Sequence, residues 1–184
     1  MKYPLPDYSL HGNITDLYID LEWNRKQKIF LFGYAYSIKT FIPLYGYKLN
    51  IKYIKEMLAP VTGNIYFYGP DIAMTEKNFD ISIRKKYTCI NLLTAFKRID
   101  PSFTSYKLCE LEKYYDIPRS VKKYKNNIWT IYSDWFKPEF RKMIIQYNKE
   151  DVLNLIRIKK TILNQNNITR SKLLAIMKDT IKKI

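Results

Sequence analysis

Residues 17–23 read LYIDLEW, and this run predicts both a β-strand and an acidic site. Side chains alternate between the two faces of a strand, so Leu17, Ile19 and Leu21 can enter a core while Asp20 and Glu22 stand together on the opposite face. Two ionised carboxylates repel each other and are costly to bury unless a cation lies between them. The pair therefore suggests a divalent metal, although an isolated D-x-E pattern is also common on the solvated face of a strand.

A second acidic pattern lies in the C-terminal half of the chain. Tyr147 and Asp151 are four residues apart in a stretch whose apolar residues have helical spacing. Residues at i and i+4 lie on one face of a helix, so the Tyr147 hydroxyl could orient a water near a metal held by Asp151. A partly buried aromatic ring beside a surface acid explains the pair equally well.

A third acid follows the β-rich run at residues 64–69. Asp71 comes directly after Gly69-Pro70 and begins a helical stretch, a position typical of a helix N-cap. An acid at a strand-to-helix junction can also face a ligand at the carboxyl edge of a sheet. Asp80, near the end of the same helical stretch, is the alternative third acid. We prefer Asp71 because it comes just after the strand.

Together these motifs resemble the DnaQ-like, or DEDD, 3′–5′ exonucleases of the ribonuclease H-like superfamily, and are most similar to the predicted ribonuclease H-like exonucleases of archaea. Asp20 and Glu22 match the D-x-E of the first strand, Asp71 the second motif, and Tyr147 and Asp151 the Y-x-x-x-D motif. The tyrosine is typical of the DEDDy branch. The similarity extends from about residue 14 to residue 162.

The resemblance implies an α/β ribonuclease H-like fold with a central mixed five-stranded sheet flanked by helices. It also implies hydrolysis from the 3′ end of single-stranded DNA or RNA by two divalent cations, Mg²⁺ or Mn²⁺. The expected metal ligands are Asp20, Glu22, Asp71 and Asp151, with Tyr147 positioning the attacking water. Two alternatives remain: an endonuclease of the same fold that acts on a hybrid or a branched structure, and a catalytically silent nucleic-acid-binding module.

The charge of the chain also favours a nucleic-acid partner. The 184 residues include 32 Lys and Arg against 17 Asp and Glu, a formal net charge of +15. Such an excess points to a polyanion, and the abundant Tyr, Phe and Trp offer stacking surfaces for unpaired bases. If residues 121–132 are helical, Lys122 and Lys125 lie on one side and can grip backbone phosphates. A solvated basic surface explains this cluster as well.

Several classes of protein are disfavoured by composition. Two Cys and one His indicate neither a disulfide framework nor a zinc site, and they disfavour the histidine version of the DEDD site. No apolar run approaches the length of a membrane span, and the first residues lack a secretory signal pattern. We therefore expect no membrane association and an intracellular, cytoplasmic location.

The chain is long enough for about one domain, which we expect over residues 14–163 after a lead-in at 1–13. Three β-rich runs at 17–23, 28–37 and 40–46 predict an antiparallel meander. A helix at 50–60, a strand at 64–69 and a fifth strand at 87–91 follow. The remaining pattern predicts helices at 91–99, 105–115, 121–132 and 138–163, and a basic C-terminal helix at 169–184 that docks on the domain.

Overall fold

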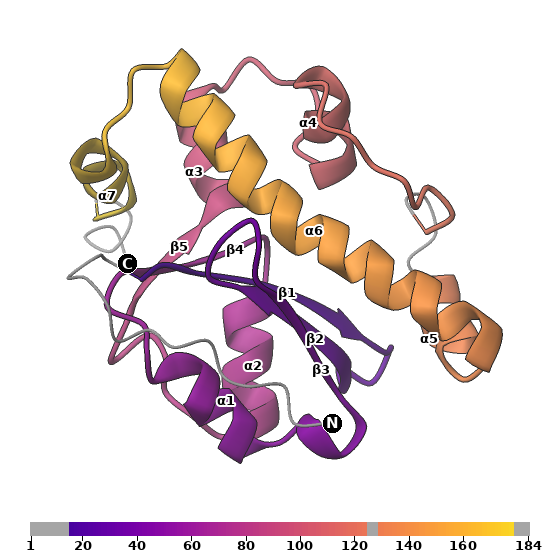
Figure 1. Ribbon diagram of the computed structural model, residues 1–184. Coiled ribbons are helices and arrows are strands. Elements are labelled where there is room, and N and C mark those ends of the chain that lie inside the picture. The colour runs from indigo at the N-terminus through magenta and orange to yellow at the C-terminus, as the bar shows by residue number, and fades with distance from the viewer. Residues whose placement is uncertain (1–14, 125–128, 179–184) are drawn as a thin grey trace.

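A computed structural model of the protein describes residues 15–124 and 129–178. Five strands form one sheet, with helices on both of its faces (Figure 1). The strands are β1 (Leu17–Trp23), β2 (Ile29–Ala35), β3 (Phe41–Tyr45), β4 (Asn64–Phe67) and β5 (Thr88–Asn91). The α-helices are α1 (Ile51–Leu58), α2 (Asp71–Phe79), α3 (Leu92–Ile99), α4 (Leu108–Tyr114), α5 (Trp129–Trp135), α6 (Pro138–Gln165) and α7 (Arg170–Lys178), and a short 3₁₀ helix, η1, spans Gly46–Lys48.

The sheet is mixed, as the sequence predicts. Its strand order is β3-β2-β1-β4-β5. The first three strands form the predicted antiparallel meander, whereas β4 pairs parallel to β1 and β5 pairs parallel to β4. The helix α1 provides the crossover that a parallel neighbour of β1 requires. The strand β1 therefore lies in the middle of the sheet, and its two acids lie on the central strand.

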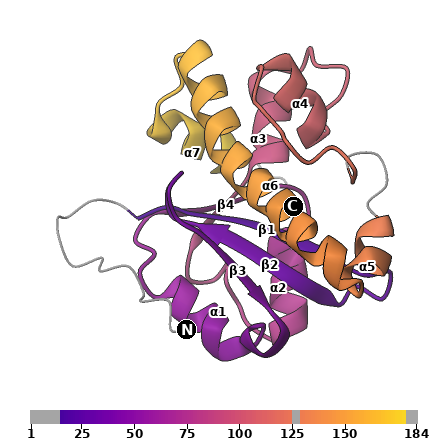
Figure 2. The same ribbon diagram turned by 45° about the vertical axis from the view of Figure 1, so that its right-hand side comes forward.

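The two faces of the sheet bury different residues of β1. Leu17, Ile19 and Leu21 pack in one core cluster with residues of α1 and α2, whereas Tyr18 belongs to a second cluster with residues of α3 and α6. Figures 1 and 2 show α6 running diagonally over the face opposite α1 and α2. Because side chains alternate along a strand, Asp20 and Glu22 share the face of Tyr18 and lie beneath α6.

A glycine lets α6 approach this face closely. Gly33 of β2 is the cross-strand partner of Asp20. A Cβ atom at Gly33 would lie only 1.9 Å from Oδ1 of Asn148, which belongs to α6. A larger residue at position 33 would displace the side chain of Asn148. The missing side chain at Gly33 thus makes room for the Asn148 amide beside Asp20.

The predicted helix at residues 121–132 is wrong over its first part. Residues 121–124 are not helical, and α5 begins only at Trp129. The Val121 backbone N–H donates to the Glu150 carboxylate at 3.1 Å, and Lys123 bonds Asp134 at 2.6 Å. These tertiary contacts outweigh the local amphipathic pattern. Lys122 is exposed in this non-helical segment, whereas Lys125, the lead-in at 1–13 and the last residues of the chain lie outside the described residues.

The helix α7 packs on the rest of the protein. Its Leu173 is fully buried in the cluster that contains residues of α3 and α6, and Arg170 donates to Asp16 at 3.0 Å. Among the described helices, none combines the length and the apolar character needed to cross a membrane.

Candidate metal centre

The acids of β1 meet an acid of α6. Asp20, Glu22 and Asp151 each offer a carboxylate oxygen, and these oxygens all lie within 4.8 Å of one another. Asp20 and Glu22 come together because they are two residues apart on one strand, and Asp151 reaches them because α6 crosses that strand. The residues that are expected to hold metal in the first and last motifs are therefore adjacent in space, although about 130 residues separate them in the chain.

Tyr147 lies one helical turn before Asp151 and is 9% exposed. Its ring packs edge-on against Tyr124, with 5.7 Å between the ring centroids, and the guanidinium carbon of Arg119 lies 4.8 Å from the centroid of the Tyr147 ring. Burial, followed by the charges of Asp151 and Glu22, raises the pKa of Tyr147. The hydroxyl is therefore a neutral phenol near neutral pH, able to donate a hydrogen bond to a water or a phosphate oxygen.

Asp71 is a buried acid at the first position of α2. Pro70, rather than Asp71, occupies the N-cap position, so the expected capping role is wrong. Asp71 is 2% exposed and lies outside the group of three oxygens, yet its charge raises the pKa of both Asp20 and Glu22. Asp80, the alternative, is exposed at the opposite end of α2. Of the two, Asp71 is the one electrostatically connected to the site.

Burial disfavours the ionised form of all four carboxyl groups. Burial raises the pKa of Asp20 well above its usual range, and the charges of Asp151, Asp71 and Glu22 raise it further. Burial and the charges of Asp151 and Asp71 do the same at Glu22, and burial is also the main cause at Asp71. Burial raises the pKa of Asp151 to about 6, even though the neighbouring Arg119 favours its ionised form. A cluster of this kind gains stability from any bound cation.

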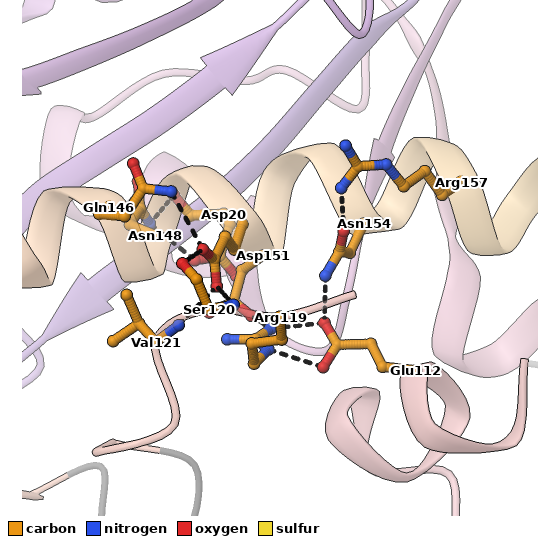
Figure 3. A network of polar contacts seen from close by, with 11 residues as sticks. Asp20, Glu112, Arg119, Ser120, Val121, Gln146, Asn148, Asp151, Asn154 and Arg157 are labelled. Atoms are coloured by element: carbon orange, nitrogen blue, oxygen red, sulfur yellow. Dashed lines mark hydrogen bonds and ion pairs between the residues drawn. The ribbon is translucent and has the colours of Figure 1, made fainter. Parts of the chain in front are cut away.

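Asn148 and Arg119 complete the site (Figure 3). The Asn148 side chain donates to Oδ2 of Asp20 at 2.7 Å and to its backbone carbonyl at 3.2 Å. Arg119 makes an ion pair with Asp151. Neither Arg119 nor Asn148 was singled out from the sequence. The available signal for Asn148 was its spacing from Asp151, because residues at i and i+3 lie on one face of a helix.

The site contains buried polar atoms that are not paired within the protein. Within residues 15–124 and 129–178, three buried side-chain polar atoms have no hydrogen-bond partner: Oδ2 of Asp71, Oδ1 of Asn148 and Nη1 of Arg119. All three belong to this site. Buried polar atoms are normally paired, so the unpaired Oδ2 of Asp71 fits a cation, whereas Nη1 of Arg119 is a donor that suits a water or an anion. Carboxylate and amide oxygens are the donors that Mg²⁺ and Mn²⁺ prefer.

The raised pKa values predict an unusual pH dependence for the metal-free protein. At a pH above the pKa of these acids in the unfolded chain, the folded chain still holds protons that the unfolded chain has released. The free energy of unfolding therefore falls as the pH rises from the pKa of the unfolded chain through the pKa of the folded chain. We expect the melting temperature in EDTA to fall between about pH 5 and pH 7, a window above the usual titration of exposed acids. Differential scanning fluorimetry across this range measures the effect.

Addition of Mn²⁺ should reverse this loss at neutral pH, because a cation binds the ionised acids of the folded state. The Asp20→Asn protein is the control, since it carries one acid fewer and should show a shallower decline. A melting temperature in EDTA that is constant or rises between these pH values would contradict the prediction.

A mixed α/β sheet with acids on its central strand and on the helix that crosses it defines the class of ribonuclease H-like proteins. A family model described as RNase_H superfamily matches residues 17–163, and the chain belongs to this superfamily. No curated protein matches the chain. Membership in the superfamily indicates a nuclease role and nucleic-acid substrates, and the excess of basic residues agrees with this. Enzymes of this class typically use divalent metals.

Proposed function

We propose that the protein is a metal-dependent 3′–5′ exonuclease that hydrolyses single-stranded DNA or RNA. The convergence of the Asp20, Glu22 and Asp151 oxygens within 4.8 Å is the observation that carries the proposal. A cluster of acids is an unfavourable surface for phosphate unless cations intervene, and here it lies in a protein with a net charge of +15. The proposal of an exonuclease of the DEDDy branch rests on the pattern Asp20, Glu22, Asp71, Tyr147 and Asp151.

In this proposal the four acids hold two Mg²⁺ or Mn²⁺ ions, and none of them acts as a general base. Bound there, the cations would activate a water and stabilise the leaving 3′ oxygen. Asn148 holds the Asp20 carboxylate through its 2.7 Å hydrogen bond, so that the second Asp20 oxygen can face a cation. Tyr147 donates its hydroxyl proton in a hydrogen bond that orients the water. The exposed Lys122 contacts the phosphate backbone of the substrate.

The test uses single-stranded DNA and RNA oligonucleotides with a 5′ label, incubated with Mn²⁺ or with EDTA. A metal-dependent ladder that shortens from the 3′ end supports the exonuclease and reveals its sugar preference. Discrete internal products would favour an endonuclease instead. A substrate that is bound but never cut, even with Mn²⁺, would contradict the catalytic proposal and leave a nucleic-acid-binding module.

Tyr147→Phe should lower the cleavage rate about 10- to 100-fold, because one hydrogen bond to a charged or polarised group contributes about 1.5–3 kcal/mol. Phenylalanine keeps the ring that contacts Tyr124 and Arg119, so we expect the melting temperature to stay within a few degrees of the parent value. Single-turnover rates at saturating Mn²⁺ measure the effect. Parent-level cleavage by the variant would show that the Tyr147 hydroxyl has no part in the reaction.

A further inference from the structure

Arg119 is the only basic side chain among the described residues that makes an ion pair with one of the four acids of the site. Its side chain is 7% exposed, far below the exposure of a surface arginine. Nη2 bonds Oδ1 of Asp151, and the guanidinium also stacks 4.8 Å from the centroid of the Tyr147 ring. One residue thus contacts the proposed metal ligand and the proposed water-positioning residue on consecutive turns of α6.

A second acid fixes Arg119 in place (Figure 3). Glu112 of α4 is 2% exposed and binds the guanidinium in bidentate fashion, with Nε to Oε2 at 2.7 Å and Nη2 to Oε1 at 2.5 Å. Glu112 in turn accepts from Asn154 at 2.7 Å, and Asn154 accepts from Arg157 at 2.5 Å. Because a bidentate pair constrains both position and plane, Arg119 is a rigid support.

We propose that Arg119 is a positioning residue of the metal centre, which orients the Asp151 carboxylate for the cation while Glu112 holds Arg119. The inference rests on the proposed function. Arg119 bonds Oδ1 of Asp151, so Oδ2 is the oxygen that this contact leaves for a cation. Metal-binding carboxylates are generally held by hydrogen bonds from residues that do not touch the metal themselves. Loss of such a residue typically weakens metal binding 10- to 100-fold.

A simple counter-ion would act in the opposite direction. If Arg119 only neutralised the acids, its removal would make the site more negative and would tighten cation binding, because a guanidinium and a divalent cation repel each other. The bidentate anchor on Glu112 and the buried chain of hydrogen bonds through Asn154 favour orientation over simple neutralisation. The sign of the change in Mn²⁺ affinity therefore separates the two roles.

The experiment is a calorimetric titration of the full chain with Mn²⁺ in the absence of nucleic acid. We expect Arg119→Met to bind Mn²⁺ about 10- to 100-fold more weakly than the parent. Arg119→Lys should recover little of this loss, since one ammonium cannot reproduce the fork that joins Glu112 to Asp151. Arg84→Met is the matched control, because Arg84 also makes an ion pair with a glutamate, Glu76, but on the surface, where Nε and Nη2 both donate to Oε2 at 2.9 and 2.5 Å.

Glu112→Gln provides a second variant should Arg119→Met fail to fold, as judged by circular dichroism. It leaves Arg119 in place but removes the anchoring charge, and we expect about tenfold weaker Mn²⁺ binding. Unchanged or tighter binding in the folded variants would overturn the inference alone. A parent protein that binds no Mn²⁺ would overturn the proposed metal centre itself, and a loss of the same size in Arg84→Met would show a non-specific effect that also overturns the inference.

Discussion

Asp20→Asn is expected to lower metal-dependent cleavage at least about 1000-fold, equivalent to about 4 kcal/mol of activation free energy. Asp20 lies on the central strand, and its oxygen is within 4.8 Å of those of Glu22 and Asp151. An amide is neutral and a much weaker ligand for Mg²⁺ or Mn²⁺ than a carboxylate. Loss of the Asp20 carboxylate removes a ligand from this group, and no other described carboxylate is placed to substitute for it.

The fold should survive this change. The Asn148 amide can donate to the oxygen of an Asn at position 20 as it does to Asp20, so the contact between α6 and β1 is kept. Removal of a charge from a cluster with raised pKa values should also stabilise the metal-free protein at neutral pH.

The measurement for Asp20→Asn is the single-turnover rate with Mn²⁺, beside the affinity for single-stranded oligonucleotide in EDTA by fluorescence anisotropy. Asp116→Asn is the matched control, because Asp116 is exposed and has a left-handed backbone conformation, with φ of 50°, that Asn tolerates. We expect parent-level rates from the control. Cleavage by Asp20→Asn at the parent rate would contradict the metal-centre proposal.

Local periodicity was sufficient to predict much of the fold. The alternation in LYIDLEW placed Leu17, Ile19 and Leu21 on one face and both acids on the other, which is how β1 is arranged. The antiparallel meander followed from runs whose period is two. These features depend on neighbours a few residues apart, and such neighbours are visible in a single sequence.

The long-range polar contacts of the site could not be predicted in this way. Arg119 and Asp151 are 32 residues apart, and Glu112 and Asn154 are 42 apart. Nothing in the local pattern distinguishes Arg119 from the neighbouring exposed lysines. The same applies to Gly33, whose missing Cβ matters only because Asn148 of α6 lies above it. Such features appear only once helices and strands are packed together.

The helix prediction for residues 121–132 was wrong over residues 121–124 for a related reason. The segment has an amphipathic pattern, but Ser120 and the backbone of Val121 bind Glu150, and Tyr124 is fully buried beside Tyr147. A non-helical connection that satisfies these contacts is preferred to a free helical turn. This connection directly follows Arg119, which pairs with Asp151 of α6.

Asp71→Asn is expected to reduce cleavage by a factor similar to that of Asp20→Asn, about 1000-fold, whereas Asp80→Asn should stay within about twofold of the parent rate. The two residues begin and end the same helix, α2, so the pair is a matched comparison. Asp71 is 2% exposed and its Oδ2 has no partner, while Asp80 is exposed and its backbone, with φ of 48°, suits Asn. Single-turnover rates with Mn²⁺ measure both variants.

The stoichiometry of Mn²⁺ binding by Asp71→Asn tests how the acids are divided between the cations. Asp71 lies outside the 4.8 Å group of Asp20, Glu22 and Asp151, so its proposed role is to help hold a second cation beside the one at that group. Calorimetry should then show two bound Mn²⁺ ions in the parent and one in the variant, with the melting temperature in EDTA unchanged or higher because a buried acid is gone. Loss of both ions would mean that Asp71 supports the whole site. Loss of neither, with activity abolished by Asp80→Asn instead, would transfer the third acidic role to Asp80.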